Sequence, residues 1–154
     1  MGSVYITSTE PGSGKALVSL GIIDLVLRKS AKVCFFRPII SKSTSNDDWY
    51  YGEEDSHDED IELIVKHFRL DQTYEESYGL HTKEANALLG QNREDDLINC
   101  IISKYKALEA KADFVVCEGS DYLSKGAAVE FNLNQTIAKN LGLSIVVVAS
   151  AFDR

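Results

Sequence analysis

An eight-residue segment near the start of the chain has the residue types needed to bind phosphate. It runs from Thr9 to Ala16 and reads Thr-Glu-Pro-Gly-Ser-Gly-Lys-Ala. A short apolar stretch, Val4 to Ile6, precedes it, and a longer apolar stretch begins at Leu17. A strand, a turn ending in Gly-Lys and then a helix form the layout of a phosphate-binding loop. Backbone N–H groups point into such a turn, the helix presents its positive end, and the lysine adds a full charge.

Two of the four anchor positions of this loop carry an unexpected residue. The usual pattern is Gly-x-x-x-x-Gly-Lys-Ser/Thr, in which the hydroxyl group helps to hold magnesium. Thr9 stands where the first glycine belongs, and Ala16 stands where the hydroxyl belongs. The shape of the loop is therefore expected to be kept, while its magnesium chemistry is expected to be damaged. The candidate ligand-binding residues of the loop are Thr9, Glu10, Pro11, Gly12, Ser13, Gly14, Lys15 and Ala16.

Size and composition narrow the class of protein. The 154 residues (17.1 kDa) suit one domain, here taken as 1–154, that can bury a substantial core. A net charge of −8 argues against binding to nucleic acid or to anionic membranes. No apolar run is long enough to span a bilayer and no leader opens the chain, so we predict a cytoplasmic protein. The odd number of cysteines, without paired spacing, predicts buried, reduced thiols at Cys34, Cys100 and Cys117.

Alternating apolar segments predict a doubly wound, parallel α/β sheet. Four continuous apolar runs are typical of strands covered on both faces, at 4–6, 33–36, 114–117 and 145–149. Pro38 is expected to end the second of these strands, because proline cannot continue a central ladder. Helices are expected at 16–29, at 61–68 after an Asp60 cap, at 82–90 with Thr82 as cap, at 93–108 with acidic residues in the first turn, and at 132–141. The first helix is apolar on nearly every side and is expected to be packed on more than one face.

Residues 41–60 form an acidic and aromatic segment without helical or strand periodicity. We expect a long loop there. Its three adjacent aromatic residues, Trp49, Tyr50 and Tyr51, favour packing or a subunit contact over a base-stacking platform in so acidic a chain. The acidic cluster from Asp47 to Glu62 includes His57 but has no recognisable ligand spacing, which favours a solvated loop over a metal site.

Three features together resemble the dethiobiotin-synthetase-like P-loop superfamily. They are the loop at 9–16, Phe36-Arg37-Pro38 at the end of the second strand, and Cys117-Glu118-Gly119 at the end of the third. Within that superfamily the chain resembles the N-terminal domain of the long bacterial phosphate acetyltransferases, most strongly over 113–143. The resemblance implies a P-loop NTPase-like sheet of strand order 2-3-1-4, with the loop at the carboxyl end of the central strand.

The resemblance also implies roles for individual residues. Lys15 would neutralise phosphate, and Glu118 would contact magnesium. Arg37 replaces a lysine and can grip a carboxylate or phosphate, but it cannot act as a base. Without a hydroxyl at Ala16, we expect ATP turnover to be slight or absent and nucleotide binding with magnesium to be weakened or lost, while anion binding survives. Three plainer readings stay open: the turn is a relic that only shapes the backbone, Glu118 makes a local hydrogen bond, and Arg37 makes a structural ion pair.

Two functions follow from the resemblance. The first is a regulatory or assembly domain that belongs to a longer phosphate acetyltransferase, which converts acetyl-CoA and phosphate to acetyl phosphate and CoA. Its partners would be the C-terminal acetyltransferase domain of the parent chain, a small anionic ligand and further copies of itself. The alternative is an ATP-dependent synthetase or ligase of the dethiobiotin synthetase or cobyrinic acid amidotransferase type. The substitutions at Thr9, Ala16 and Arg37 favour the first.

Overall fold

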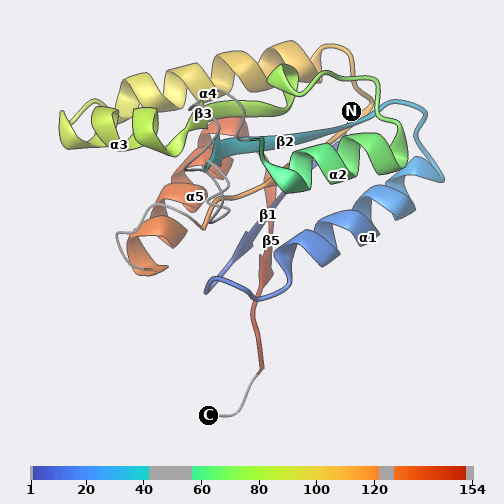
Figure 1. Cartoon of the computed structure of the whole chain (residues 1–154), viewed down its shortest axis with the longest axis horizontal. Helices are drawn as coiled ribbons and strands as arrows, with labels where there is room; N and C mark the ends of the chain where they lie inside the picture. Colours follow the sequence, from blue (N-terminus) through green and yellow to red (C-terminus); the bar gives the residue numbers. More distant parts are fainter. Residues whose placement is uncertain (1, 42–56, 122–126, 152–154) are drawn as a thin grey trace, which may run out of the picture.

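The computed structural model of the chain describes residues 2–41, 57–121 and 127–151 (Figure 1). Trp49, Tyr50 and Tyr51, with most of the predicted 41–60 loop, lie outside these ranges. The elements in chain order are β1 Gly2–Ser8, α1 Lys15–Leu27, β2 Val33–Ile40, α2 Glu59–Phe68, a 3-10 turn Glu75–Ser77, β3 Tyr78–His81, α3 Thr82–Gly90, α4 Glu94–Glu109, β4 Phe114–Glu118, α5 Ala127–Leu141 and β5 Ser144–Val148.

The strands form one parallel sheet in the order β3-β2-β4-β1-β5. The parallel α/β architecture is as predicted, but the expected order 2-3-1-4 differs because it counted four strands and left out β3. The four strands that were expected keep the expected neighbours, and β3 adds an edge next to β2. β3 was missed because Tyr-Gly-Leu-His is too short to show a strand pattern and contains a glycine.

Pro38 does not end β2, which contradicts the sequence-based expectation. β2 continues to Ile40, with Arg37 and Ile39 both paired to β3. Pairing with β4 covers Val33 to Phe36 only, so the last part of β2 has a ladder on one side. Pro38 falls between the residues paired with β3, and its missing N–H therefore interrupts neither ladder.

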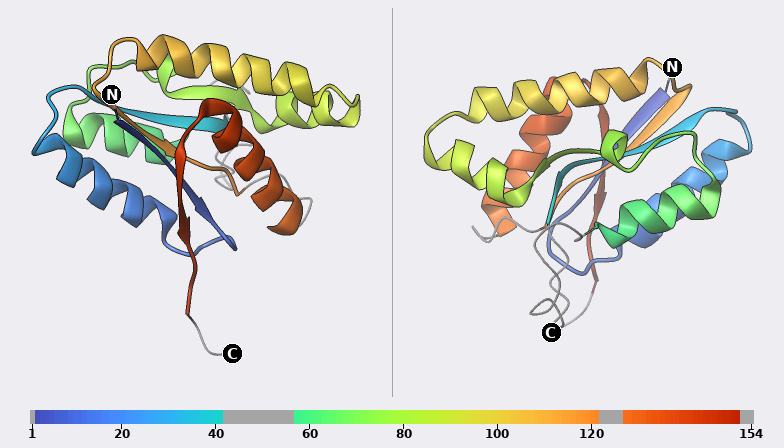
Figure 2. Two further views of the ribbon diagram at one scale, coloured as in Figure 1. Left: turned by 180° about the vertical axis from the view of Figure 1, so that it is seen from behind. Right: turned by 45° about the horizontal axis from the view of Figure 1, so that its top comes forward.

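Helices cover both faces of the sheet, as Figures 1 and 2 show. Helices α1 and α2 lie on one face, where residues such as Ile23 and Ile61 pack against the sheet. Helices α3, α4 and α5 lie on the other, where the Phe36 and Tyr105 rings meet edge to face with centroids 5.8 Å apart. The continuous apolar strands predicted this two-sided cover.

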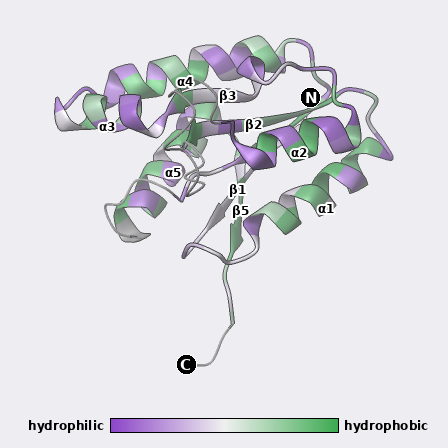
Figure 3. Cartoon of the chain, viewed as in Figure 1, coloured by the Kyte–Doolittle hydropathy of each residue, from purple (hydrophilic) through white to green (hydrophobic). Residues whose placement is uncertain are grey.

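Helix α1 is less buried than its composition suggested. Its buried residues are Lys15, Ser19 and Ile23, which form a single stripe against the sheet. Leu17 and Leu25 are 74% and 60% exposed, and hydrophobic stretches recur along the visible side of α1 in Figure 3. Helix α1 also contacts α2, so the expectation that this helix packs on more than one face holds only in part. Five further apolar residues of α1 are partly buried against the same core as Ile23: Val18, Leu20, Ile22, Val26 and Leu27.

Three helix starts differ from those predicted. Asp58, not Asp60, caps α2, because its Oδ1 accepts the Ile61 N–H at 3.0 Å. His81 occupies the cap position of α3, and Thr82 is its first residue and donates to the Ile40 carbonyl at 3.0 Å. Helix α5 begins at Ala127 instead of residue 132. Across the described ranges, no helix combines the length and apolar character needed to cross a membrane.

Two of the three thiols are buried as predicted. Cys34 lies on β2 and Cys117 on β4, and burial raises the pKa of both thiols. Cys100 on α4 is only partly covered.

Candidate phosphate-binding site

The predicted loop connects β1 to α1. Gly12 and Gly14 have positive φ angles of 74° and 88°, which glycine adopts without strain. Gly14 occupies the cap position of α1, and Lys15 is the first residue of the helix. The two glycines therefore let the backbone turn directly from the central strand into the helix, and the free N–H groups of the first helical turn face the loop.

A cavity of about 330 Å³ opens beside this loop. We call it the loop cavity. Two basic and three acidic side chains line it, together with four small residues of the loop. Its lining residues are Gly12, Ser13, Gly14, Lys15, Ala16, Arg37, Asp60, Glu118 and Asp121. The fold thus brings the ends of β1, β2 and β4 together around one hollow, as expected where parallel strands end at the same edge.

Lys15 is buried, with 5% of its side chain exposed. Its Nζ lies 2.6 Å from Asp121 Oδ2, in the segment that follows β4. The Ser8 hydroxyl donates to the other carboxylate oxygen, Oδ1, at 3.2 Å. Within the described ranges neither Lys15 Nζ nor Ser13 Oγ has a hydrogen-bond partner of good geometry, so Lys15 is held by charge attraction.

Arg37 lies at the centre of a group of carboxylates. Its side chain is almost fully buried, with Nη1 2.6 Å from Asp58 Oδ2 and 3.2 Å from Asp60 Oδ2. Its Nη2 lies 3.5 Å from Glu118 Oε1. The Asp58 carboxylate both caps α2 and neutralises Arg37, so this ion pair fixes the start of α2 beside the end of β2.

Glu118 is also engaged on its other oxygen. Ser19, one turn after Lys15 on α1, donates its hydroxyl to Glu118 Oε2 at 2.5 Å. Burial raises the pKa of the Glu118 carboxyl, while Arg37, the Ser19 hydrogen bond and Lys15 act in the opposite direction. Glu118 therefore joins α1 to the end of β4 and to the end of β2.

The segment after β4 is positioned by Asn134 on α5. Asn134 Oδ1 accepts from the Tyr5 hydroxyl at 2.7 Å and from the Ser120 N–H at 3.1 Å, and Nδ2 donates to the Ser120 carbonyl at 3.0 Å. A Cβ at Gly119 would lie 2.5 Å from Asn134 Oδ1, so only glycine fits this approach. This buried amide sets the path of the chain directly before Asp121.

Not every predicted residue faces the loop cavity. Gly12 to Ala16, Arg37 and Glu118 line it, but Thr9, Glu10 and Pro11 line a small crevice beside it. The Thr9 N–H donates to the Val148 carbonyl at 3.1 Å, and the Ser150 hydroxyl donates to the Glu10 carboxylate. The first part of the loop is thus attached to β5.

A family model described as an AAA domain matches residues 2–153. The chain belongs to this AAA domain family. It is 42% identical over 149 residues to a phosphate acetyltransferase of Synechocystis sp., and 45% identical over 148 residues to one of Nitratidesulfovibrio vulgaris. A phosphate acetyltransferase of Escherichia coli is 27% identical over 147 residues.

These alignments cover nearly all of this chain but a small part of the relatives. The chain is covered over 97%, 96% and 96% of its length, and the relatives over 20%, 20% and 19% of theirs. The chain therefore spans about a fifth of the length of these relatives and corresponds to their N-terminal region.

Several residues around the loop cavity were not singled out from the sequence. Asp121 and Asn134 were noticed only as part of the family resemblance, and Asp58 only as part of an acidic segment. Ser19 had one usable signal, since it is a polar residue four positions after Lys15 on an apolar helix. The Lys15–Asp121 and Arg37–Asp58 pairs join residues too distant in sequence for any local pattern to connect them.

A magnesium ion, which the family resemblance implies, would find few ligands here. Ala16 offers no hydroxyl, and both Glu118 oxygens contact other side chains, Oε2 the Ser19 hydroxyl and Oε1 the Arg37 guanidinium. Across the described ranges, no group of three or more His, Cys, Asp or Glu side chains is arranged to hold a metal. The residues present do not fit the usual magnesium site of a phosphate-binding loop.

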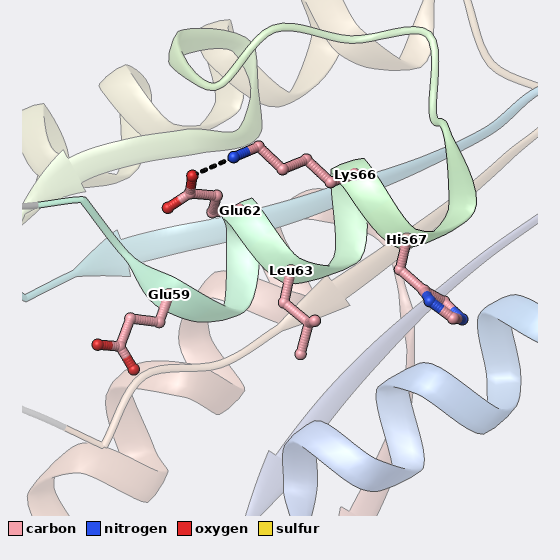
Figure 4. A pocket seen from close by; sticks show the side chains of 5 residues that line it. All are labelled: Glu59, Glu62, Leu63, Lys66 and His67. Atoms are coloured by element: carbon pink, nitrogen blue, oxygen red, sulfur yellow. Dashed lines mark hydrogen bonds and ion pairs between the residues drawn. The ribbon is translucent and has the colours of Figure 1, made fainter.

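A second hollow, along the outer side of α2, has a different character. It measures about 510 Å³ and is lined by Glu59, Glu62, Leu63, Lys66 and His67, all of the same helix. Figure 4 shows Glu62 and Lys66 turned toward each other as an ion pair, while Leu63 and His67 point toward α1. Its lining residues, all among the described ones, include no glycine turn, so the loop cavity is the better candidate for an anion.

Proposed function

We propose that the chain is the N-terminal regulatory and assembly domain of a longer phosphate acetyltransferase, and that its loop cavity binds a nucleotide or another small anionic metabolite. The sequence identity of 42–45% to two phosphate acetyltransferases over nearly the whole chain supports the first part. In this proposal the partner is the acetyltransferase portion of the parent protein, which carries out the chemistry.

One observation carries the binding part of the proposal. Lys15 is 95% buried, yet its ammonium group lies at a cavity lined by the Gly12–Lys15 turn. Burying an ammonium group is unfavourable unless an anion accompanies it, and the anion that the chain supplies here, Asp121, is partly exposed, so an incoming anion can take its place. The cavity therefore has the charge and the backbone donors that recognise phosphate or carboxylate oxygens.

Thermal unfolding of the 154-residue chain tests this binding. We expect ATP, ADP or inorganic phosphate to raise the midpoint of unfolding, because a ligand that binds only the folded state stabilises it. Lys15→Ala should abolish the shift. Lys29→Ala, which changes an exposed lysine just beyond the far end of α1, should leave the shift intact.

Phosphate release measured in the same samples separates this proposal from a synthetase. Little or no hydrolysis of ATP is expected, because the Ala16 position lacks the hydroxyl that helps to hold magnesium. Rapid hydrolysis that Lys15→Ala abolishes would favour an ATP-dependent synthetase instead. If none of the three ligands shifts the midpoint of unfolding, the binding part of the proposal is contradicted and only the assembly role remains.

A further inference from the structure

The contacts around Lys15 and Arg37 indicate which kind of anion the loop cavity can bind, and whether that anion would bring a divalent metal with it. This inference rests on the proposed function, since it concerns the ligand of the same site. It starts from three separate observations: the state of Glu118, the place of Arg37, and the contact between Lys15 and Asp121.

The first observation is that Glu118 lies beside Arg37, which also pairs with Asp58 and Asp60. The guanidinium group lies 3.5 Å from Glu118, and the Ser19 hydroxyl takes the second carboxylate oxygen. Arginine keeps its charge at any physiological pH. A fixed positive charge thus stands beside the carboxylate that would otherwise attract a divalent cation, and it would repel such a cation.

The second observation is that Asp121 already occupies Lys15. Its carboxylate makes a 2.6 Å contact with Lys15 Nζ and accepts the Ser8 hydroxyl. Asp121 remains 23% exposed, so it can turn toward solvent without dismantling the core. The Asp121 carboxylate thus occupies the position at Lys15 Nζ that the oxygen atoms of a bound anion would take.

The third observation is the balance of charge. Three carboxylates, Asp60, Glu118 and Asp121, line the cavity with two cations, Lys15 and Arg37. This surplus of negative charge would repel a nucleoside triphosphate that carries no metal ion. A small anion that replaces the Asp121 carboxylate at Lys15 changes the balance least.

We propose that the loop cavity binds a small phosphate-like anion without a divalent metal, and that this anion binds by replacing the Asp121 carboxylate at Lys15. Lys15 is the main cation for this anion, because three carboxylates already surround Arg37. The Ser13 hydroxyl, which lines the same cavity and has no hydrogen-bond partner among the described residues, is a further donor for the anion.

Calorimetric titration of the chain with inorganic phosphate in excess EDTA tests the proposal. We expect phosphate to bind, and the same titration in magnesium instead of EDTA to give an affinity within about twofold. Asp121→Asn should tighten phosphate binding by about tenfold, because an internal competitor that occupies the site most of the time is removed. Lys15→Ala should abolish binding.

Asp60→Asn is the matched control for charge. Asp60 lines the same cavity but contacts Arg37 instead of Lys15. It removes one negative charge without removing the competitor, so it should tighten binding much less than Asp121→Asn. Equal effects of the two variants would show that Asp121 acts only through its charge and would overturn replacement.

The remaining outcomes separate this inference from the proposed function. Phosphate binding that requires magnesium, or a Lys15-dependent shift with nucleotide but not with phosphate, would overturn the inference and leave the proposed function standing. No binding of phosphate or nucleotide by either the natural chain or Asp121→Asn would overturn the inference and the binding part of the proposed function together.

Discussion

Glu118 is a carboxyl group that the fold buries at a cost. It is 1% exposed, and burial is the largest influence on its pKa, which lies above the ordinary value of 4.5. Arg37, Ser19 and Lys15 offset that cost only in part. The structure accepts this because the same carboxylate joins α1 to the ends of β2 and β4.

The stability of the chain should therefore carry a pH dependence from Glu118. Below the unfolded pKa the group is protonated in both states. Above it the unfolded chain releases the proton first, so stability falls as the pH rises, until the folded carboxyl has also ionised. Glu118→Gln cannot titrate. Urea unfolding from about pH 4 to about pH 8 should show the natural chain losing stability relative to this variant as pH rises above about 4.5.

Glu62→Gln provides the matched control, because its pKa is shifted the other way. The hydrogen bond from Lys66 holds the pKa of the exposed Glu62 carboxyl below its ordinary value. As the pH rises, the free energy of unfolding of the natural chain should increase slightly relative to that of Glu62→Gln. Parallel curves for Glu118→Gln and the natural chain would contradict the burial argument.

At this scale the sequence predicted some residues of the site and missed their partners. Lys15, Arg37 and Glu118 each stand beside a recognisable signal, a Gly-Lys turn or the end of an apolar strand. The open reading of Arg37 as a structural ion pair agrees with its contact to Asp58. Which carboxylate each cation contacts depends on the order of the strands in the sheet, so the local sequence pattern could not predict it.

Among the elements, β3 depends on a glycine that lies against its neighbour. A Cβ at Gly79 would lie 2.4 Å from the Pro38 carbonyl oxygen and 3.2 Å from Ile101 on α4. The close approach lets β3 pair with β2 and lie under α4 at the same time. The four residues of β3 can therefore occupy this position only because Gly79 has no side chain.

Gly79→Ala should destabilise the chain by about 1–3 kcal/mol, the usual cost of overpacking, because a backbone atom has to shift. Gly21→Ala on the exposed side of α1, where a Cβ meets nothing within 4 Å, is the control. It should stabilise by up to about 1 kcal/mol, since alanine favours helices over glycine. Urea unfolding measures both changes, and a neutral Gly79→Ala would refute the close packing of β3.

The apolar pattern predicted buried strands better than it predicted exposure on helices. β1, β2 and β4 are central, and their continuous apolar runs match burial on both faces. Helix α1 has a similar composition but turns Leu17 and Leu25 to solvent, because a helix beside a sheet contacts it along one stripe. Composition alone does not distinguish the two cases.

For the molecule as a whole, β5 is the outermost strand on one side of the sheet. Within the described residues it pairs with β1 only. Ile145 and Val147 on this strand are 39% and 49% exposed. An apolar edge strand of this kind offers unpaired backbone groups to another chain.

We expect the 154-residue chain to self-associate as its concentration rises, and Val147→Lys to reduce this association, since a charged edge opposes pairing between chains. Val129→Lys, which changes an equally exposed valine on α5, should have little effect. Light scattering measures the mass in each case. A monomer at all concentrations, or equal loss of association in both variants, would count against the edge as the contact.

The contact between Lys15 and Asp121 also has a consequence for how the molecule responds to its surroundings. Because the chain supplies its own counter-ion, a phosphate that binds as proposed would exchange one salt contact for another and would gain only the difference in free energy between them. Such an exchange yields modest affinity and readily reversible occupancy. The occupancy of such a site would rise and fall with the concentration of an abundant metabolite. This behaviour suits sensing better than tight retention of a ligand.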